Sequence, residues 1–127
     1  MEKLTASLED YLEVICNSTN TGKPPRAIDI SKELNVSRAS VAEALKKLVQ
    51  KGYVNYDRHD SLTLTPEGKK IAEDVISKHR ILQDFFEDIL GLDSDEASEN
   101  ACKIEHVITD GAFEQISRFV EAQMLRD

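Results

Sequence analysis

Apolar residues recur at helical spacing over two short stretches near the middle of the first half of the chain. Residues 27–34 and 38–50 are predicted to be helices, and Asn35-Val36 forms the turn between them. Ser37 is a natural N-cap for the second helix. One side of that helix carries the i, i+3, i+4 and i+7 pattern of a buried face, namely Val41, Ala44, Leu45 and Leu48.

Two short segments after this helix alternate in polarity like strands. Residues 54–56 and 62–64 flank a polar tip at 57–60, which predicts a β-hairpin. Gly52 ends the preceding helix. Helix, turn, helix and hairpin in this order predict a winged helix-turn-helix.

The remaining segments have the pattern of longer helices. We expect a first helix from a cap at Thr5 or Ser7 to about Asn17, and a long one from Pro66 to about Leu90. Another opens at Asp93 and continues until Asp110-Gly111 breaks it, and the last begins at Ala112. The fold class is therefore mostly α. Residues 1–70 form a winged helix-turn-helix domain, and residues 71–127 form an all-helical domain.

The second half has more apolar surface than it can cover by itself. Phe85, Phe86, Ile89 and Leu90 need partners, and so does the apolar face of the last helix. Pairing these faces between two copies of the chain is the simplest remedy, so we expect a homodimer.

The net charge of −8 is distributed unevenly along the chain. Residues 1–70 have 11 basic and 10 acidic side chains, whereas residues 71–127 have 5 and 14. Within residues 23–51 the count is 7 basic against 3 acidic. Basic charge is thus concentrated around the second short helix, as expected of a segment that enters the major groove of double-stranded DNA.

The exposed residues of this region divide into two predicted roles. Side chains in the first turns of the second short helix could read base edges: Ser37, Ala39, Ser40 and Glu43. Cations around it could hold phosphates: Arg26, Arg38, Lys46, Lys47, Lys51 and, at the hairpin tip, Arg58.

Neither a membrane segment nor a signal segment is predicted. No run approaches the roughly 20 apolar residues that span a bilayer, and the start at Met1 is not followed by a basic and then apolar stretch. We therefore expect a cytoplasmic protein without a membrane partner. Cys16 and Cys102 are far apart in sequence and are expected to be reduced thiols.

A second group of residues has the chemistry of a metal site. Cys102, Glu105 and His106 would share the polar face of one helix, and His79 lies within the apolar stripe of another. Thiolate, carboxylate and imidazole are ligands for borderline divalent metals. Asp10 and Glu13, one turn apart on the first helix, could join them or could be solvated carboxylates. Five or six ligands would satisfy one ion, or two ions that share a carboxylate.

Several motifs in sequence order resemble the DtxR/MntR family of metal-dependent repressors. They are Leu8-Glu-Asp10-Tyr-Leu-Glu13, Val36-Ser-Arg-Ala-Ser-Val41, Ala44-Leu-Lys-Lys-Leu48, Leu62-Thr-Leu-Thr65, Gly68-Lys-Lys-Ile71, His79 and Cys102-Lys-Ile-Glu105-His106. The resemblance covers nearly the whole chain. It implies a DNA-binding domain, a metal-binding and dimerisation domain, and metal-gated binding to an operator upstream of metal-transport genes.

The resemblance also implies which residues bind metal. The family's ligand positions fall on Asp10, Glu13, His79, Cys102, Glu105 and His106. The aspartate at position 10 resembles the manganese-sensing branch of the family, whereas the cysteine at position 102 resembles the iron-sensing branch. Because a thiolate favours softer ions, we expect Fe(II) first and Mn(II) second.

Two other classes of function compete with this hypothesis. A winged-helix regulator could sense a small molecule or thiol oxidation at Cys102 or Cys16 without any metal. A zinc hydrolase would need an open coordination position and a general base, and the sequence has no His-Glu-x-x-His motif. We therefore expect a regulator and not an enzyme.

Overall fold

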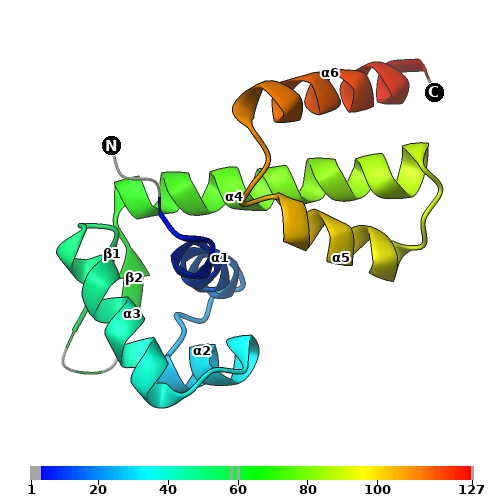
Figure 1. Ribbon diagram of the computed structural model, residues 1–127. Coiled ribbons are helices and arrows are strands. Elements are labelled where there is room, and N and C mark those ends of the chain that lie inside the picture. Colours follow the sequence, from blue (N-terminus) through cyan, green and yellow to red (C-terminus); the bar gives the residue numbers. More distant parts are fainter. Residues whose placement is uncertain (1–3, 58, 60, 127) are drawn as a thin grey trace. The chain divides into compact units, whose positions relative to one another are not determined.

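The computed structural model describes residues 4–57, 59 and 61–126, and it divides the chain into two compact units (Figure 1). Unit 1 is Met1–Glu73 and unit 2 is Asp74–Asp127. Helices dominate both units, which confirms the predicted fold class. Among the described residues, no helix has the length and apolar character that crossing a membrane requires.

Unit 1 contains three helices, a hairpin and the start of a fourth helix. In chain order these are α1 (Ala6–Asn20), α2 (Ala27–Leu34), α3 (Arg38–Gln50), β1 (Val54–Tyr56), β2 (Leu62–Leu64) and α4 (Pro66–Asp84), which continues into unit 2. Thr5 caps α1 by accepting a hydrogen bond from the Leu8 amide at 3.2 Å. The helix continues to Asn20, three residues beyond the predicted end.

The turn between α2 and α3 follows the prediction in detail. Asn35 has a left-handed backbone with φ of 55°, which an asparagine tolerates better than most residues. The Ser31 hydroxyl donates to the Val36 carbonyl at 2.6 Å, and the Ser37 hydroxyl accepts from the Ser40 amide at 3.1 Å. These local bonds fix the direction in which α3 leaves the turn.

The core of unit 1 lies where the apolar faces of its helices and hairpin meet. The side chains that are almost completely buried there are Leu12, Ile15, Ile30, Val41, Leu45, Leu48, Val54 and Leu62. All four residues of the predicted buried face of α3 are buried. Their burial leaves the opposite side of α3 exposed.

The hairpin is antiparallel, and it is joined tightly to α3 and α4. Val54 pairs with Leu64 and Tyr56 with Leu62. Gly52 ends α3 with φ of 82°, a conformation that suits glycine. Gly68 lies close to the backbone of Tyr53, because a Cβ atom at this position would overlap with the Tyr53 carbonyl oxygen.

Unit 2 is built from the rest of α4 and three further elements: η1 (Phe85–Ile89), α5 (Ser94–Ile104) and α6 (Asp110–Arg126). The predicted single helix to Leu90 instead becomes a π-helical turn at η1, where the Leu90 amide donates to the Phe85 carbonyl at 3.1 Å. Asp93 caps α5 by accepting from the Glu96 amide at 2.8 Å, as the sequence predicted.

One predicted helix boundary in unit 2 is wrong. α5 ends at Ile104, and Asp110-Gly111 lies in the first turn of α6 instead of breaking the preceding helix. Thr109 explains the early start of α6, since its hydroxyl accepts from the Ala112 amide at 3.2 Å. Because the helical period stops after Ile104, Val107 leaves the apolar face and is 72% exposed.

Candidate metal centre and DNA-reading surface

Four of the predicted ligands lie together within unit 2. His79 is on α4, Cys102 is in the last turn of α5, Glu105 is its C-cap residue, and His106 follows in the turn toward α6. The sequence prediction placed the last three on one helical face. The end of α5 at Ile104 instead puts His106 beyond the helix, where the turn brings its ring to Glu105.

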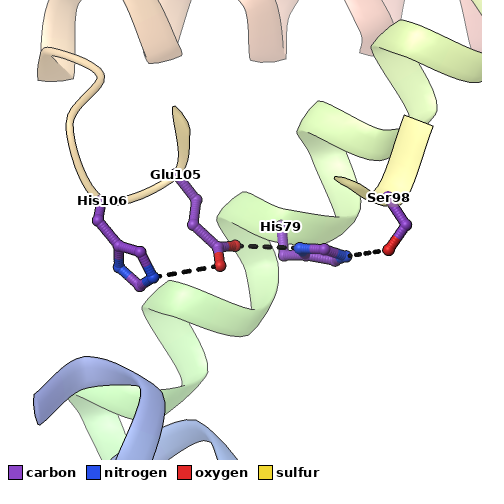
Figure 2. A network of polar contacts seen from close by, with 4 residues as sticks. All are labelled: His79, Ser98, Glu105 and His106. Atoms are coloured by element: carbon purple, nitrogen blue, oxygen red, sulfur yellow. Dashed lines mark hydrogen bonds and ion pairs between the residues drawn. The ribbon is translucent and has the colours of Figure 1, made fainter. Parts of the chain in front are cut away.

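Glu105 is the central residue of this cluster (Figure 2). Its Oε2 lies 3.1 Å from His79 Nδ1, and its Oε1 lies 3.4 Å from His106 Nε2. The Glu105 side chain is fully buried, while those of His106 and His79 are 9% and 21% exposed. A buried carboxylate held between two imidazoles provides one anion, with a ring nitrogen beside each of its two oxygens.

Cys102 adds a sulfur atom to this arrangement. One ligand atom each from His79, Cys102 and Glu105 can be chosen so that all three lie within 4.8 Å of one another. Bond lengths of about 2.0–2.3 Å place the ligand atoms of one ion about 3.0–4.4 Å apart. The spacing of these three atoms is therefore close to what one divalent metal requires, and their nitrogen, oxygen and sulfur donors suit a borderline transition metal.

Asp10 and Glu13 belong to unit 1, where they lie one turn apart on α1 with half-buried side chains. The other four predicted ligands, His79, Cys102, Glu105 and His106, all belong to unit 2 and form a cluster within it. The part that Asp10 and Glu13 play stays a prediction.

Sequence reasoning missed one residue that touches a predicted ligand. The Ser98 hydroxyl oxygen lies 3.3 Å from His79 Nε2, on the opposite side of the ring from Glu105 (Figure 2). Ser98 precedes Cys102 by four residues on α5, so the two lie one turn apart. That spacing is the signal that could have found it.

The predicted DNA-reading residues described by the structure are all exposed. They are Arg26, Ser37, Arg38, Ala39, Ser40, Glu43, Lys46, Lys47 and Lys51. Glu43 and Lys47 form an ion pair of 3.7 Å along α3. Arg58 lies outside the described residues. The carboxylate of the preceding Asp57 accepts hydrogen bonds from the amides of His59 and Ser61.

The two cysteines differ in environment. Cys102 is exposed, whereas Cys16 is buried within unit 1. Burial raises the pKa of the Cys16 thiol, and the nearby Glu73 carboxylate raises it further, while Asn20 and Lys69 act in the opposite direction. A raised thiol pKa lowers the fraction of thiolate, so Cys16 is poorly suited to nucleophilic or redox chemistry.

Comparison with known proteins connects both parts of the chain with one family. Residues 3–62 match the family model described as "Iron dependent repressor, N-terminal DNA binding domain". Residues 65–123 match "Iron dependent repressor, metal binding and dimerisation domain". Together the two matches cover the predicted DNA-reading residues and all six predicted metal ligands, with Asp10 and Glu13 in the first match and the other four in the second.

Curated relatives extend over most of the chain. An uncharacterised HTH-type transcriptional regulator of Methanocaldococcus jannaschii is 36% identical over 119 residues, which cover 93% of this chain and 95% of the relative. The HTH-type transcriptional regulator MntR of Oceanobacillus iheyensis is 31% identical, with 91% and 78% covered. The diphtheria toxin repressor of Corynebacterium glutamicum is 33% identical, with 87% of this chain but 48% of the repressor covered.

Solved structures agree with this assignment. The manganese regulator SloR superposes with a TM-score of 0.81 at 29% identity and covers 93% of this chain, which spans 55% of the SloR chain. A manganese-dependent transcriptional repressor in complex with manganese gives a TM-score of 0.79 at 27% identity, with 90% and 52% covered. The chain thus spans about half the length of these solved relatives. It belongs to the DtxR/MntR family of metal-dependent transcriptional repressors, which are regulators and not enzymes.

Proposed function

We propose that this chain is a homodimeric repressor that binds operator DNA when Fe(II), or in second place Mn(II), is bound. The observation that carries the proposal is the buried Glu105 carboxylate between the rings of His79 and His106, with Cys102 beside them. A buried carboxylate is costly unless it is paired. Its pairing with two imidazoles and a nearby thiol gives the cluster the donors of a transition-metal site.

Six residues are the proposed ligands: Asp10, Glu13, His79, Cys102, Glu105 and His106. A divalent ion supplies positive charge that offsets the repulsion between the carboxylates and the thiolate. Asp10 and Glu13 are included because their i, i+3 spacing directs both carboxylates from one side of α1 and because the resemblance to the family implies ligands at these positions. Their carboxylates complete a ligand set that unit 2 offers only in part.

The proposed regulation follows from the origin of these ligands. Asp10 and Glu13 are carried by the DNA-reading unit and the other four by the second unit. An ion bound by ligands from both units would favour a single arrangement of the two units. In a homodimer, that arrangement would set the distance between the two α3 helices that read the DNA. Successive major grooves on one side of DNA are roughly 34 Å apart. The ion can shift this equilibrium only by its differential affinity for the binding-competent arrangement.

The metal preference follows from the mixed ligand set. The Cys102 sulfur favours Fe(II), Co(II), Ni(II) or Zn(II), whereas the three carboxylates and two imidazoles of the set also suit Mn(II). Iron-dependent family models and relatives named as manganese regulators both match the chain. The sulfur ligand is the reason for placing Fe(II) first.

DNA reading is assigned to the exposed side of α3 and its flanks. Ala39 suits a thymine methyl group and Glu43 a cytosine amino group, with Ser37 and Ser40 beside them. The cations Arg26, Arg38, Lys46, Lys47, Lys51 and Arg58 are proposed to hold phosphates.

The decisive experiment measures DNA binding as a function of metal under anaerobic conditions. Duplexes would first be enriched from a random pool with Fe(II) present, and the affinity of the enriched duplex would then be measured by fluorescence anisotropy with Fe(II), Mn(II), Co(II), Zn(II) or a chelator. We expect at least tenfold tighter binding with Fe(II) than with chelator. Equal affinity in both conditions would contradict the proposal.

The same assay separates metal sensing from thiol sensing. A regulator that responds to oxidation at Cys102 would lose its response in the Cys102→Ser variant yet ignore metal. The metal sensor would keep a metal response in that variant, weakened for Fe(II) and Zn(II) more than for Mn(II). The Cys16→Ser variant is the matched control, since Cys16 is buried in the other unit.

A further inference from the structure

Ser98 lies outside the proposed ligand set, and its side chain contacts one of the proposed ligands directly. Its hydroxyl oxygen lies 3.3 Å from His79 Nε2, and the side chain is half-buried on α5. The other ring nitrogen of His79, Nδ1, lies 3.1 Å from Glu105 Oε2. The two nitrogens therefore face different partners, a hydroxyl that can donate or accept and a carboxylate (Figure 2).

We propose that Ser98 is a positioning residue for the metal centre, which holds His79 with Nδ1 toward the ion and pairs with the proton on Nε2. This inference rests on the proposed function. It adds to the ligand set a residue that does not bind the metal but orients one that does.

The identity of the ligating nitrogen follows from its neighbour. A neutral imidazole binds a metal through the nitrogen that lacks a proton, so the other nitrogen must carry it. Nδ1 is the nitrogen beside Glu105, itself a proposed ligand. Two ligand atoms on one ion are about 3.0 Å apart at right angles for bonds of about 2.1 Å, close to the 3.1 Å between Nδ1 and Oε2. Nε2 then carries the proton and donates it to the Ser98 oxygen.

A hydroxyl suits this position in both states of the site. When no ion is bound, an ionised Glu105 can only accept, so a neutral His79 carries its proton on Nδ1 and Nε2 accepts from the Ser98 hydroxyl. With Nδ1 directed toward a bound ion, a neutral ring would carry its proton on Nε2, the proton of Nδ1 having gone to solvent and that of Nε2 having come from it. The Ser98 hydroxyl would then act as acceptor instead of donor, after a rotation about its Cβ–Oγ bond.

The replacement series Ser98→Ala and Ser98→Thr tests this role. Removing a hydrogen-bond partner behind a metal-binding histidine typically weakens metal binding by about 10-fold to 100-fold. We expect Zn(II) affinity, measured by competition with a chromophoric chelator, to fall about tenfold in Ser98→Ala. Threonine keeps the hydroxyl, so Ser98→Thr should bind within about twofold of the native chain. Ser94→Ala, at the exposed start of the same helix, is the matched control and should change nothing.

The position of the proton on His79 is the readout that a purely structural role would not move. Long-range ¹H–¹⁵N NMR spectra distinguish the two tautomers, and Zn(II) is suitable because it is diamagnetic. We expect the proton on Nε2 in the Zn(II)-loaded native protein and on Nδ1 in the metal-free protein. The His79→Gln variant identifies the signals.

Two results would overturn the inference: a Zn(II)-loaded native protein with the proton on His79 Nδ1, or a folded Ser98→Ala variant with native affinity. If that variant does not fold by circular dichroism, the tautomer of the native protein and the affinity of Ser98→Thr decide. Failure of the native chain to bind Zn(II) or Fe(II) at all would instead refute the proposed function, and this inference would fall with it.

Discussion

The exposed side of α3 and the cluster around Glu105 are built on opposite principles. The α3 side chains are exposed, and their positions follow from one helix and its cap. The cluster is centred on a fully buried carboxylate and joins α4 to a turn more than 20 residues further along the chain. A surface made of many separate charges tolerates the loss of one, whereas a cluster centred on one carboxylate does not. Variants that compare the two regions can test this difference.

The largest change in metal affinity is expected when Glu105 is replaced. Replacing it by glutamine keeps the size of the side chain but removes the charge and one of the two acceptor oxygens that face His79 and His106. We expect Zn(II) affinity to fall at least 100-fold, about 2.7 kcal/mol. The control is Glu99→Gln on α5, whose exposed carboxylate pairs with Lys103. Affinity within threefold of native in Glu105→Gln would show that the cluster is not the metal centre.

Gly68 tests how strictly unit 1 depends on its own packing. A methyl group there would collide with the Tyr53 backbone, so Gly68→Ala should destabilise unit 1 by about 2 kcal/mol or more. Urea unfolding of the metal-free chain measures this. Gly111→Ala is the matched control, since open space surrounds that position in the first turn of α6 and alanine favours helices. Equal stability of the two variants would contradict the close packing of Gly68.

A single cation on α3 should have a smaller effect. If Lys46 holds a phosphate, Lys46→Ala will weaken binding to all duplexes by a similar factor, about threefold to tenfold. The slope of the logarithm of the binding constant against the logarithm of the salt concentration should become smaller by about one. Glu43→Ala should instead relax the preference at one base pair. The ion pair of Glu43 with Lys47 is exposed and contributes little to stability, so folding is not the reason for either result. A sequence-dependent loss in Lys46→Ala would contradict its assignment.

The smallest effect is expected on the melting temperature, through the pH dependence that Asp84 gives to stability. Burial raises the pKa of Asp84, and the neighbouring Asp88 and Glu87 raise it further, while Arg80 lowers it. The folded state therefore binds the proton more tightly than the unfolded state, and the stability due to this proton is lost as pH rises above 3.8. Asp84→Asn removes this loss, so it should raise Tm at pH 7 by about 2 °C.

Calorimetry at a fixed protein concentration measures this shift. The gain should disappear at pH 3, where Asp84 is protonated in both states. Asp84 also lines a groove of about 720 Å³ between η1 and α6, together with Phe119 and Met124. A second copy of the chain covering this groove would bury Asp84 further and enlarge the effect. A lower Tm in Asp84→Asn at pH 7 would contradict the assigned direction.

Periodicity and capping residues were sufficient for most of unit 1. The caps at Thr5 and Ser37, the turn at Asn35 and the hairpin all depend on interactions between residues close in sequence. Local hydrogen bonds and side-chain spacing are visible in one sequence because few residues decide them. The residues of the cluster around Glu105 were likewise named from their chemistry, and they lie within the segment that matches the metal-binding and dimerisation family model, while their role as ligands stays a prediction.

The arrangement of the cluster was decided by tertiary structure. The sequence could not show that α5 ends at Ile104, because the cap at Thr109 competes with a continuous helical period. Nor could it show that Ser98 faces His79 or that Glu105 lies between two rings, since these contacts join segments distant in sequence. Residue type determined which chemistry is available, whereas packing of α4 against the end of α5 determined which atoms meet.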